Sequence, residues 1–350
     1  MSNNKTSHHQ DTTPPRTRDA VAIAKTPRYE ETEGLETRFL RCSPSGVPYL
    51  DWGGQGPVLH FAHANGFPPG TYNSFAALLT DRFHVLGWEG RALWGTRDPC
   101  QPCQQRRAEY RQRRAEYRQH GAECPPAQFR HWRELADDLA RFLREINSDG
   151  IIGAGHSLGA VTTLFCAVAN PGLFKAVVLI DPVIVAAQMA PVVALAVALG
   201  LSSRTRVPAG ARRRRTDWPN REAVFRAYRA APVFARWQDR FLRDYVASGT
   251  VENPGGGVRL RYPREWEARI FETVPADVWL SIPRLRHMPL LVLRGEHSDT
   301  YRRDTMRLMH WLLPQGTFLE IAGADHFVPM SQPEATAEAI KAFLDRLNSD

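Results

Sequence analysis

Residues 151–159 have the sequence IIGAGHSLG, the most informative segment of the chain. The apolar start predicts a short buried strand, and the apolar run at 160–169 predicts a buried helix. Between them, Gly155 and Gly159 flank Ser157 in the pattern G-x-S-x-G. A serine on such a sharp turn needs neighbours without side chains, because strand and helix nearly touch there. The pattern therefore predicts that the Ser157 hydroxyl projects above the carboxyl edge of a sheet, beside the first amides of a helix.

Short apolar segments alternate with helix-length segments from about Leu35 onward, which predicts an α/β fold with a mostly parallel sheet flanked by helices. The first two strands, at 37–41 and 47–52, are expected to pair as a hairpin. Buried parallel strands are expected at 58–62, 83–88, 151–154, 176–180, 290–293 and 317–321. Helices are expected at 75–80, 132–146, 158–169, 302–313 and 333–347.

About a hundred residues lie between the strands expected at 176–180 and 290–293. Their aromatic residues recur at helical spacing, which predicts a helical cap inserted over the edge of the sheet. The stripe consists of Phe234, Trp237, Phe241 and Tyr245, and we interpret it as the core of the cap. The expected organisation is a disordered tail at 1–34, a core formed by 35–181 and 286–350, and a cap at 182–285.

Residues 182–201 form an almost uncharged stretch that is long enough in principle to span a bilayer. It contains Pro182, Gln188 and Pro191, and it follows an expected buried strand. These features favour a buried or pocket-facing segment of the cap. A membrane span is one alternative. Another is contact with a membrane surface, which the six arginines of 204–215 would assist.

Composition places the chain among globular proteins, with 350 residues, 43% of them hydrophobic, and a net charge of +8. The positive charge is concentrated at 105–118 and 204–215, and the sequence contains no recognisable nucleic-acid-binding module, so we expect no nucleic-acid partner. Five cysteines are too few, and odd in number, for a disulfide scaffold. The first 34 residues lack the apolar run of a signal peptide. Reduced thiols and a cytoplasmic location are therefore expected.

A serine hydroxyl becomes a good nucleophile only when a base removes its proton and a third group orients that base. His326 lies in the loop after the last expected strand, where it can reach the same edge as Ser157. Acidic residues follow two neighbouring strands. We favour Asp299 as the orienting carboxylate, with Asp181 and Glu296 as alternatives.

Acyl transfer also requires hydrogen-bond donors for the oxyanion that develops on the substrate. The amide of Leu158, first in the helix after Ser157, is one expected donor. The second is expected from HANGFPP, residues 63–69, a glycine- and proline-rich turn that directly follows the strand at 58–62.

The motifs HANGFPP, GHSLG, LRGEHSD and GADHF resemble those of the α/β-hydrolase superfamily. The resemblance covers about residues 45–347 and is to the capped serine-hydrolase branch, which includes esterases and lipases. The resemblance implies an α/β-hydrolase fold with Ser157 as nucleophile, His326 as general base and then acid, and Asp299 as its carboxylate. Phe67 would donate the second oxyanion amide if Asn65-Gly66-Phe67 matches the family's His-Gly-X turn. Asn65 is the alternative donor.

Serine at the turn excludes the chemistry of haloalkane dehalogenases and epoxide hydrolases, which need a carboxylate there to form an alkyl ester that water can open. The expected reaction is hydrolysis of a carboxylic ester or related acyl bond in a small, largely apolar substrate, without a cofactor. A carbon–carbon bond hydrolase or thioesterase with the same triad is an alternative. A non-catalytic binding protein of this fold is another.

Cysteines and a histidine follow one another as C-x2-C and then H-x3-C, a pattern that could hold zinc. The residues are Cys100, Cys103, His120 and Cys124. The segment between them contains the unit QRRAEYR twice in tandem, at 105 and 112. Such a short copy indicates a tolerated surface insertion rather than fixed ligand geometry. We therefore interpret these cysteines as ordinary free thiols and expect no metal.

Overall fold

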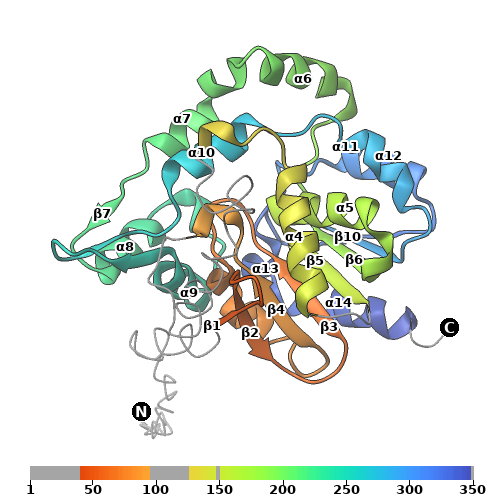
Figure 1. Ribbon diagram of the computed structural model, residues 1–350, viewed down its shortest axis with the longest axis horizontal. Helices are drawn as coiled ribbons and strands as arrows, with labels where there is room; N and C mark the ends of the chain where they lie inside the picture. The colour runs from red at the N-terminus through yellow and green to blue at the C-terminus, as the bar shows by residue number, and fades with distance from the viewer. Residues whose placement is uncertain (1–39, 95–125, 147–149, 348–350) are drawn as a thin grey trace, which may run out of the picture.

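The computed structural model describes residues 40–94, 126–146 and 150–347 (Figure 1). Its centre is an eight-stranded sheet in the order β1-β2-β4-β3-β5-β6-β10-β11. Strand β2 pairs antiparallel with β1 and with β4, and the other neighbours pair parallel. The strands are β1 (Leu40–Cys42), β2 (Pro48–Gly53), β3 (Val58–Ala62), β4 (His84–Trp88), β5 (Ile151–His156), β6 (Phe174–Ile180), β10 (Leu290–Gly295) and β11 (Thr317–Ile321).

Helices cover both faces of this sheet, and strand β6 shows why. Its residues Val177 and Leu179 join one apolar cluster, whereas Val178 and Ile180 join the other, so alternate side chains of one strand are buried on opposite faces. On the first face lie α4 (Arg133–Ile146), α5 (Leu158–Ala169) and α12 (Arg303–Leu312). The second face carries η1 (Pro69–Tyr72), α2 (Asn73–Ala76), α13 (Val328–Ser331) and α14 (Pro333–Leu347).

The structure confirms the α/β fold with a mostly parallel sheet. It also confirms the antiparallel pairing of the first two strands over the described residues. The helix expected at 75–80 is different, because the helical segment ends at Ala76 and is followed by hydrogen-bonded turns up to Phe83. The tail at 1–34, the tandem copy and the cysteine–histidine pattern all lie outside the described residues.

A long insertion, residues 181–289, separates β6 from β10, which are neighbours in the sheet. Its longer helices are α6 (Ala190–Ala198), α7 (Arg206–Arg212), α8 (Arg221–Arg229), α9 (Asp239–Gly249) and α10 (Arg264–Glu272). Shorter helical segments are η5 (Ala187–Met189), η6 (Leu201–Arg204), η7 (Pro232–Phe234), α11 (Val278–Ser281) and η8 (Ile282–Leu285).

The insertion is not purely helical, contrary to the expectation. Strands β7 (Asp217–Trp218), β8 (Thr250–Glu252) and β9 (Val258–Leu260) form a small antiparallel sheet in the order β7-β9-β8. Strands of two or three residues are too short to show an alternating pattern in the sequence. The aromatic stripe is buried as expected, with Phe234, Trp237, Phe241 and Tyr245 at most 6% exposed.

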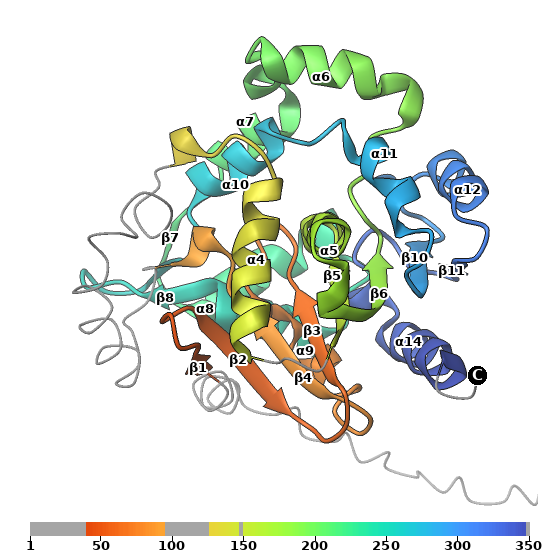
Figure 2. The ribbon, with the colours of Figure 1, turned by 45° about the vertical axis from the view of Figure 1, so that its right-hand side comes forward.

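Within the segment 182–201, Pro182 and Ile184 are buried, but helix α6 does not have the buried position that its composition suggested. Helix α6 lies at the outer edge of the insertion in both views (Figures 1 and 2), and none of its nine residues is buried. No helix within the described ranges has both the length and the apolar character needed to cross a membrane.

Two cysteines belong to the described residues, and they differ. Cys166 in α5 is a free, buried thiol, whereas Cys42 at the end of β1 is disulfide-bonded. The expectation of uniformly reduced thiols is therefore wrong for Cys42.

Candidate active site

Ser157 occupies the sharp turn between β5 and α5. Its backbone has φ 58° and ψ −116°, a conformation that residues other than glycine rarely adopt. A Cβ on Gly155 would lie 2.4 Å from the carbonyl oxygen of Gly159, and one on Gly159 would lie 2.1 Å from that of Ala62. No side chain fits either position, which is the steric reason for G-x-S-x-G.

A continuous hydrogen-bond chain joins a serine, a histidine and an aspartate at the carboxyl edge of the sheet. His326 Nε2 lies 3.0 Å from Ser157 Oγ, and His326 Nδ1 lies 2.8 Å from Asp181 Oδ1. Asp181 is completely buried, while the His326 side chain remains 17% exposed. The carboxylate fixes the proton on Nδ1, which leaves Nε2 free to accept the serine proton.

The prediction that Asp299 orients the histidine is wrong. Asp299 is exposed, and its carboxylate accepts a hydrogen bond from the neighbouring Thr300 hydroxyl at 3.2 Å. The alternative Glu296 instead accepts the Gly323 amide at 2.8 Å. Asp181, the other alternative, makes this contact with the histidine from the end of β6, the strand beside β5 in the sheet.

Local backbone geometry explains why Asp181 reaches the histidine. Asp181 has φ 42°, an unusual conformation for an aspartate, and its amide donates to the Leu293 carbonyl of the adjacent strand at 2.7 Å. Its carboxylate then accepts hydrogen bonds from the Gly295 amide at 2.8 Å and the Ser298 hydroxyl at 2.6 Å. Three donors, counting His326, thus hold the carboxylate in place.

Two residues that sequence analysis missed connect the parts of this site. His156 Nε2 lies 2.8 Å from the His326 carbonyl oxygen, and the Tyr72 hydroxyl lies 2.8 Å from His156 Nδ1. Burial, reinforced by the nearby His326, holds the pKa of His156 well below 6.5, so the ring is neutral. Because a carbonyl only accepts, Nε2 carries the proton and the Tyr72 hydroxyl donates to Nδ1.

The same tyrosine reaches the loop that follows β3. The Ala64 amide donates to the Tyr72 hydroxyl at 3.1 Å. Tyr72 and His156 therefore link the 63–69 loop, the turn that holds Ser157 and the backbone of His326. His156 is the variable residue inside G-x-S-x-G itself, but nothing in the local sequence marks Tyr72 as its partner.

The amide of Leu158 begins α5, where a helix has no internal acceptor for its first amides. The expected second donor, Phe67, does not fit, because its amide already donates to the Ala64 carbonyl at 3.2 Å within the turn. The Asn65 amide has no hydrogen-bond acceptor among the described residues. The backbone amide of Asn65 is therefore the better candidate, and the Phe67 prediction is wrong.

The Asn65 side chain anchors its loop to the insertion. Its Nδ2 donates to the Glu267 carbonyl at 3.0 Å, and its Oδ1 accepts from the Tyr262 hydroxyl at 3.1 Å. A second connection is the fully buried ion pair of Arg261 with Glu89 at 2.5 Å, in which Glu89 follows β4. These contacts hold the insertion against the loops that surround Ser157.

Aromatic side chains lie beside His326. The Phe327 ring centroid is 5.2 Å from that of His326, 5.1 Å from that of Phe67 and 5.1 Å from that of Trp237. Trp237 and Tyr245 belong to the stripe that the sequence indicated, and Tyr245 contacts Phe67 at 4.6 Å. The insertion thus packs buried aromatic side chains against Phe67 and Phe327, the second of which contacts His326.

The described residues contain no candidate metal site. Within them, no three histidine, cysteine, aspartate or glutamate side chains are placed to hold a metal ion. The pattern of Cys100, Cys103, His120 and Cys124 falls in the segment that is not described.

Comparison with known proteins identifies the family. The model of the alpha/beta hydrolase family matches residues 58–339, which is most of the chain. The chain belongs to this family. It is 24% identical over 294 residues to the 2-(acetamidomethylene)succinate hydrolase of Mesorhizobium japonicum, a match that covers 83% of this chain and 89% of the relative.

Solved structures of hydrolases share the fold. The crystal structure of E-2-(acetamidomethylene)succinate hydrolase matches with a TM-score of 0.65 and 22% identity, covering 87% of this chain and 98% of that one. An esterase of M. tuberculosis matches with a TM-score of 0.61 and 19% identity, covering 91% and 96%. At these identities the likeness shows the fold and leaves the substrate open.

Proposed function

We propose that this member of the alpha/beta hydrolase family is a serine hydrolase that cleaves a carboxylic ester or related acyl bond through an acyl-enzyme. The hydrogen-bond chain from Ser157 through His326 to Asp181 carries this proposal. The three groups have the contacts that nucleophilic catalysis by serine requires, and they meet at one edge of the sheet.

The reaction begins when Ser157 Oγ attacks the substrate carbonyl carbon and His326 Nε2 removes the hydroxyl proton. The Leu158 and Asn65 amides donate hydrogen bonds to the oxyanion of the tetrahedral intermediate. As the intermediate collapses, His326 gives its proton to the leaving group. A water molecule activated by His326 then attacks the acyl-enzyme, releases the acid and restores Ser157.

The residues around Ser157 and His326 hold the reacting groups in position. Asp181 holds the His326 ring and stabilises the imidazolium that forms. Tyr72 and His156 hold the backbone of His326 and the 63–69 loop, which contains the Asn65 amide, in fixed positions relative to each other. Tyr262 holds the Asn65 side chain and thereby the direction of its amide. These contacts hold the reacting groups in fixed positions, which preorganises the site.

The insertion acts as a cap in this proposal, and it favours a largely apolar acyl or leaving group. The support is the aromatic cluster of Phe67, Trp237, Tyr245 and Phe327 beside His326. Apolar side chains with few polar groups are the usual lining of small-molecule sites.

Turnover of a substrate panel tests the proposal. The panel contains p-nitrophenyl acetate, p-nitrophenyl octanoate, octanoyl-CoA and 2-(acetamidomethylene)succinate, the last being the compound in the name of the Mesorhizobium relative. We expect hydrolysis of the esters, with octanoate preferred to acetate, and loss of turnover in His326→Ala. Preference for the thioester or for the succinate derivative would contradict the ester and apolar assignments. No turnover above His326→Ala with any compound would contradict the enzymatic proposal.

A further inference from the structure

Helix α6 and its flanks form an apolar surface that the fold leaves exposed. Six of the eleven large hydrophobic residues that are exposed in the described chain lie between positions 189 and 207. We call them the α6 surface: Met189, Val192, Leu195, Leu199, Leu201 and Val207, with exposures from 46% to 63%. An exposed cluster of this kind normally marks an interaction site in a folded protein.

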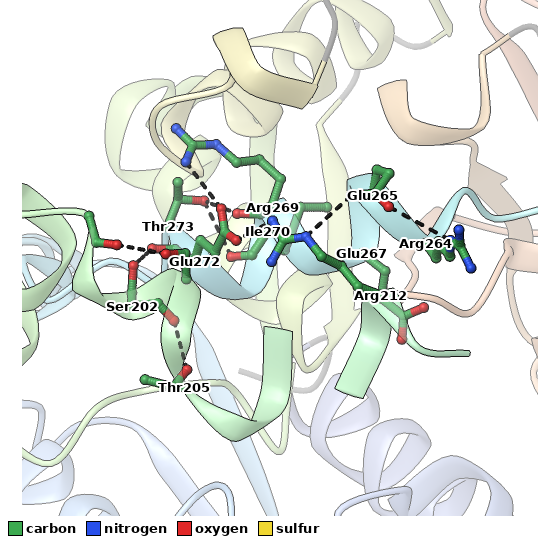
Figure 3. Close-up of polar contacts among 12 residues, drawn as sticks. Ser202, Thr205, Arg212, Arg264, Glu265, Glu267, Arg269, Ile270, Glu272 and Thr273 are labelled. Atoms are coloured by element: carbon green, nitrogen blue, oxygen red, sulfur yellow. Dashed lines mark hydrogen bonds and ion pairs between the residues drawn. The ribbon is translucent and has the colours of Figure 1, made fainter. Parts of the chain in front are cut away.

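Polar contacts fix the flank of α6 to the rest of the insertion. The Ser202 hydroxyl of η6 donates to the Glu272 carbonyl of α10 at 2.8 Å, and the Arg212 guanidinium of α7 pairs with the carboxylates of Glu265 and Glu272 (Figure 3). Further hydrogen bonds connect Thr205 to Ser202 and Arg269 to Glu272. The segments beside α6 are therefore tied to α10, while α6 itself lies on the outside (Figures 1 and 2).

The charged residues of this segment have a single sign. Between Asp181 and Asp217 the sequence contains six arginines and no acidic residue. Arg214 pairs with Glu267 at 2.5 Å, as Arg212 pairs with its two glutamates. By contrast Arg204, Arg206 and Arg213 are exposed, and none of them forms an ion pair within the part of the chain that the structure describes.

We propose that the α6 surface binds the surface of an anionic membrane. The apolar side chains enter the boundary between headgroups and acyl chains, and Arg204, Arg206 and Arg213 contact lipid phosphates. A nine-residue helix cannot span the bilayer, so α6 lies at the interface. A second copy of the chain fits less well, because a twofold contact through α6 would bring two sets of unpaired arginines together.

Vesicle flotation of the full chain tests this assignment. Vesicles of pure phosphatidylcholine are compared with vesicles that also contain phosphatidylglycerol, at low and high salt. We expect binding to the anionic vesicles that weakens as salt rises, because screening reduces the attraction of arginine for phosphate. The variant Ser157→Ala should bind as wild type does, which separates this surface from the proposed catalytic site.

Variants with matched controls locate the contact. Leu195→Ser with Leu199→Ser should weaken partition by about 100-fold or more, whereas Leu347→Ser, at an exposed leucine at the end of α14, should not change it. Replacing Arg204, Arg206 and Arg213 by glutamine should weaken binding to anionic vesicles by about 100-fold. Arg307→Gln with Arg346→Gln is the control for exposed arginines elsewhere.

Three outcomes would overturn the proposal. The first is no binding to either kind of vesicle. The second is equal binding to both kinds, or equal loss in the α6 variants and their controls. The third is a wild-type dimer that the double serine variant converts to a monomer without any change in vesicle binding, which would make a second copy the occupant.

Discussion

Helices α5 and α6 have similar compositions and opposite environments. Neither contains a charged residue: α5 reads LGAVTTLFCAVA and α6 reads APVVALAVA. Eleven of the twelve residues of α5 are buried, whereas none of α6 is buried. The difference arises because α5 connects two adjacent strands of the sheet and packs on the face of the sheet. Helix α6 belongs to the insertion and lies on its outer side (Figure 2). Apolar composition therefore predicts that a helix will contact other apolar groups. Its position in the fold determines whether those groups belong to the same chain.

The largest effect on activity is expected at Asp181. This buried aspartate and the exposed Asp299 differ in environment as helices α5 and α6 do. Asp181→Asn removes the carboxylate that holds His326 in its working tautomer, so kcat should fall by about 10⁴-fold. Asp299→Asn changes an exposed side chain, and kcat should stay within about twofold of wild type. Steady-state turnover of the best ester substrate measures both. The reverse ranking would return the role to Asp299.

Substituting one leucine in each helix tests the comparison directly. Leu164 in α5 is 0% exposed and Leu195 in α6 is 60% exposed. Leu164→Ala should lower the free energy of unfolding by about 2–5 kcal/mol, because it leaves a cavity in a packed core. Leu195→Ala should change it by less than about 0.5 kcal/mol. Equilibrium denaturation of both variants gives the two values; similar losses would mean that α6 is packed within the protein.

Buried histidines should make stability depend on pH in a range where exposed histidines have little effect. Burial lowers the pKa of His60 to about 3 and that of His63 to about 4, so both are neutral in the folded protein and bind protons only when it unfolds. Their contribution is fully present above pH 6.5 and is lost progressively as pH falls below it. The free energy of unfolding should thus decrease from pH 6.5 to pH 5.

The variant His60→Leu measures how much His60 alone contributes to this dependence of stability on pH. Neither ring nitrogen of His60 has a hydrogen-bond partner among the described residues, so leucine fills the site without leaving a polar group unpaired. Between pH 6.5 and 5 the slope of stability against pH should decrease by about 1.4 kcal/mol per pH unit. His310→Leu, at an exposed position, serves as the comparison. An unchanged slope in His60→Leu would show that folding does not lower the pKa of this ring.

The smallest effect on activity is expected at Tyr72, which connects the 63–69 loop to His156. Tyr72→Phe removes the hydroxyl that His156 and the Ala64 amide share. Losing these positioning hydrogen bonds should lower kcat by about tenfold, with KM nearly unchanged. A variant that is destabilised but keeps the wild-type kcat would show a purely structural role for Tyr72.

Features that depend on neighbouring residues could be predicted from the sequence. The strand, turn and helix around Ser157 follow from the glycines beside it, and the loop position of His326 follows from the last strand. The acid could not be chosen in this way, because Asp181 and Asp299 both follow strands of the sheet. The choice depends on the backbone turn at Asp181 and on Ser298, whose hydroxyl donates to its carboxylate.

Other features depend on contacts between distant segments. The second oxyanion donor was misplaced because only the folded loop shows that the Phe67 amide is already bonded to Ala64. Tyr72 and Tyr262 gain their roles through partners 84 and 197 positions away in the chain. The position of α6 was missed for the same reason, since its composition is that of a buried helix.

Covalent labelling tests the central claim most directly. Wild type and Ser157→Ala are treated with a fluorophosphonate, and the intact mass of each protein is measured. The account predicts that wild type gains one phosphonyl group, that peptide mapping places it on Ser157, and that Ser157→Ala gains none. Equal labelling of the two proteins, or no labelling of a wild type that hydrolyses esters, would contradict the assignment of Ser157 as the nucleophile.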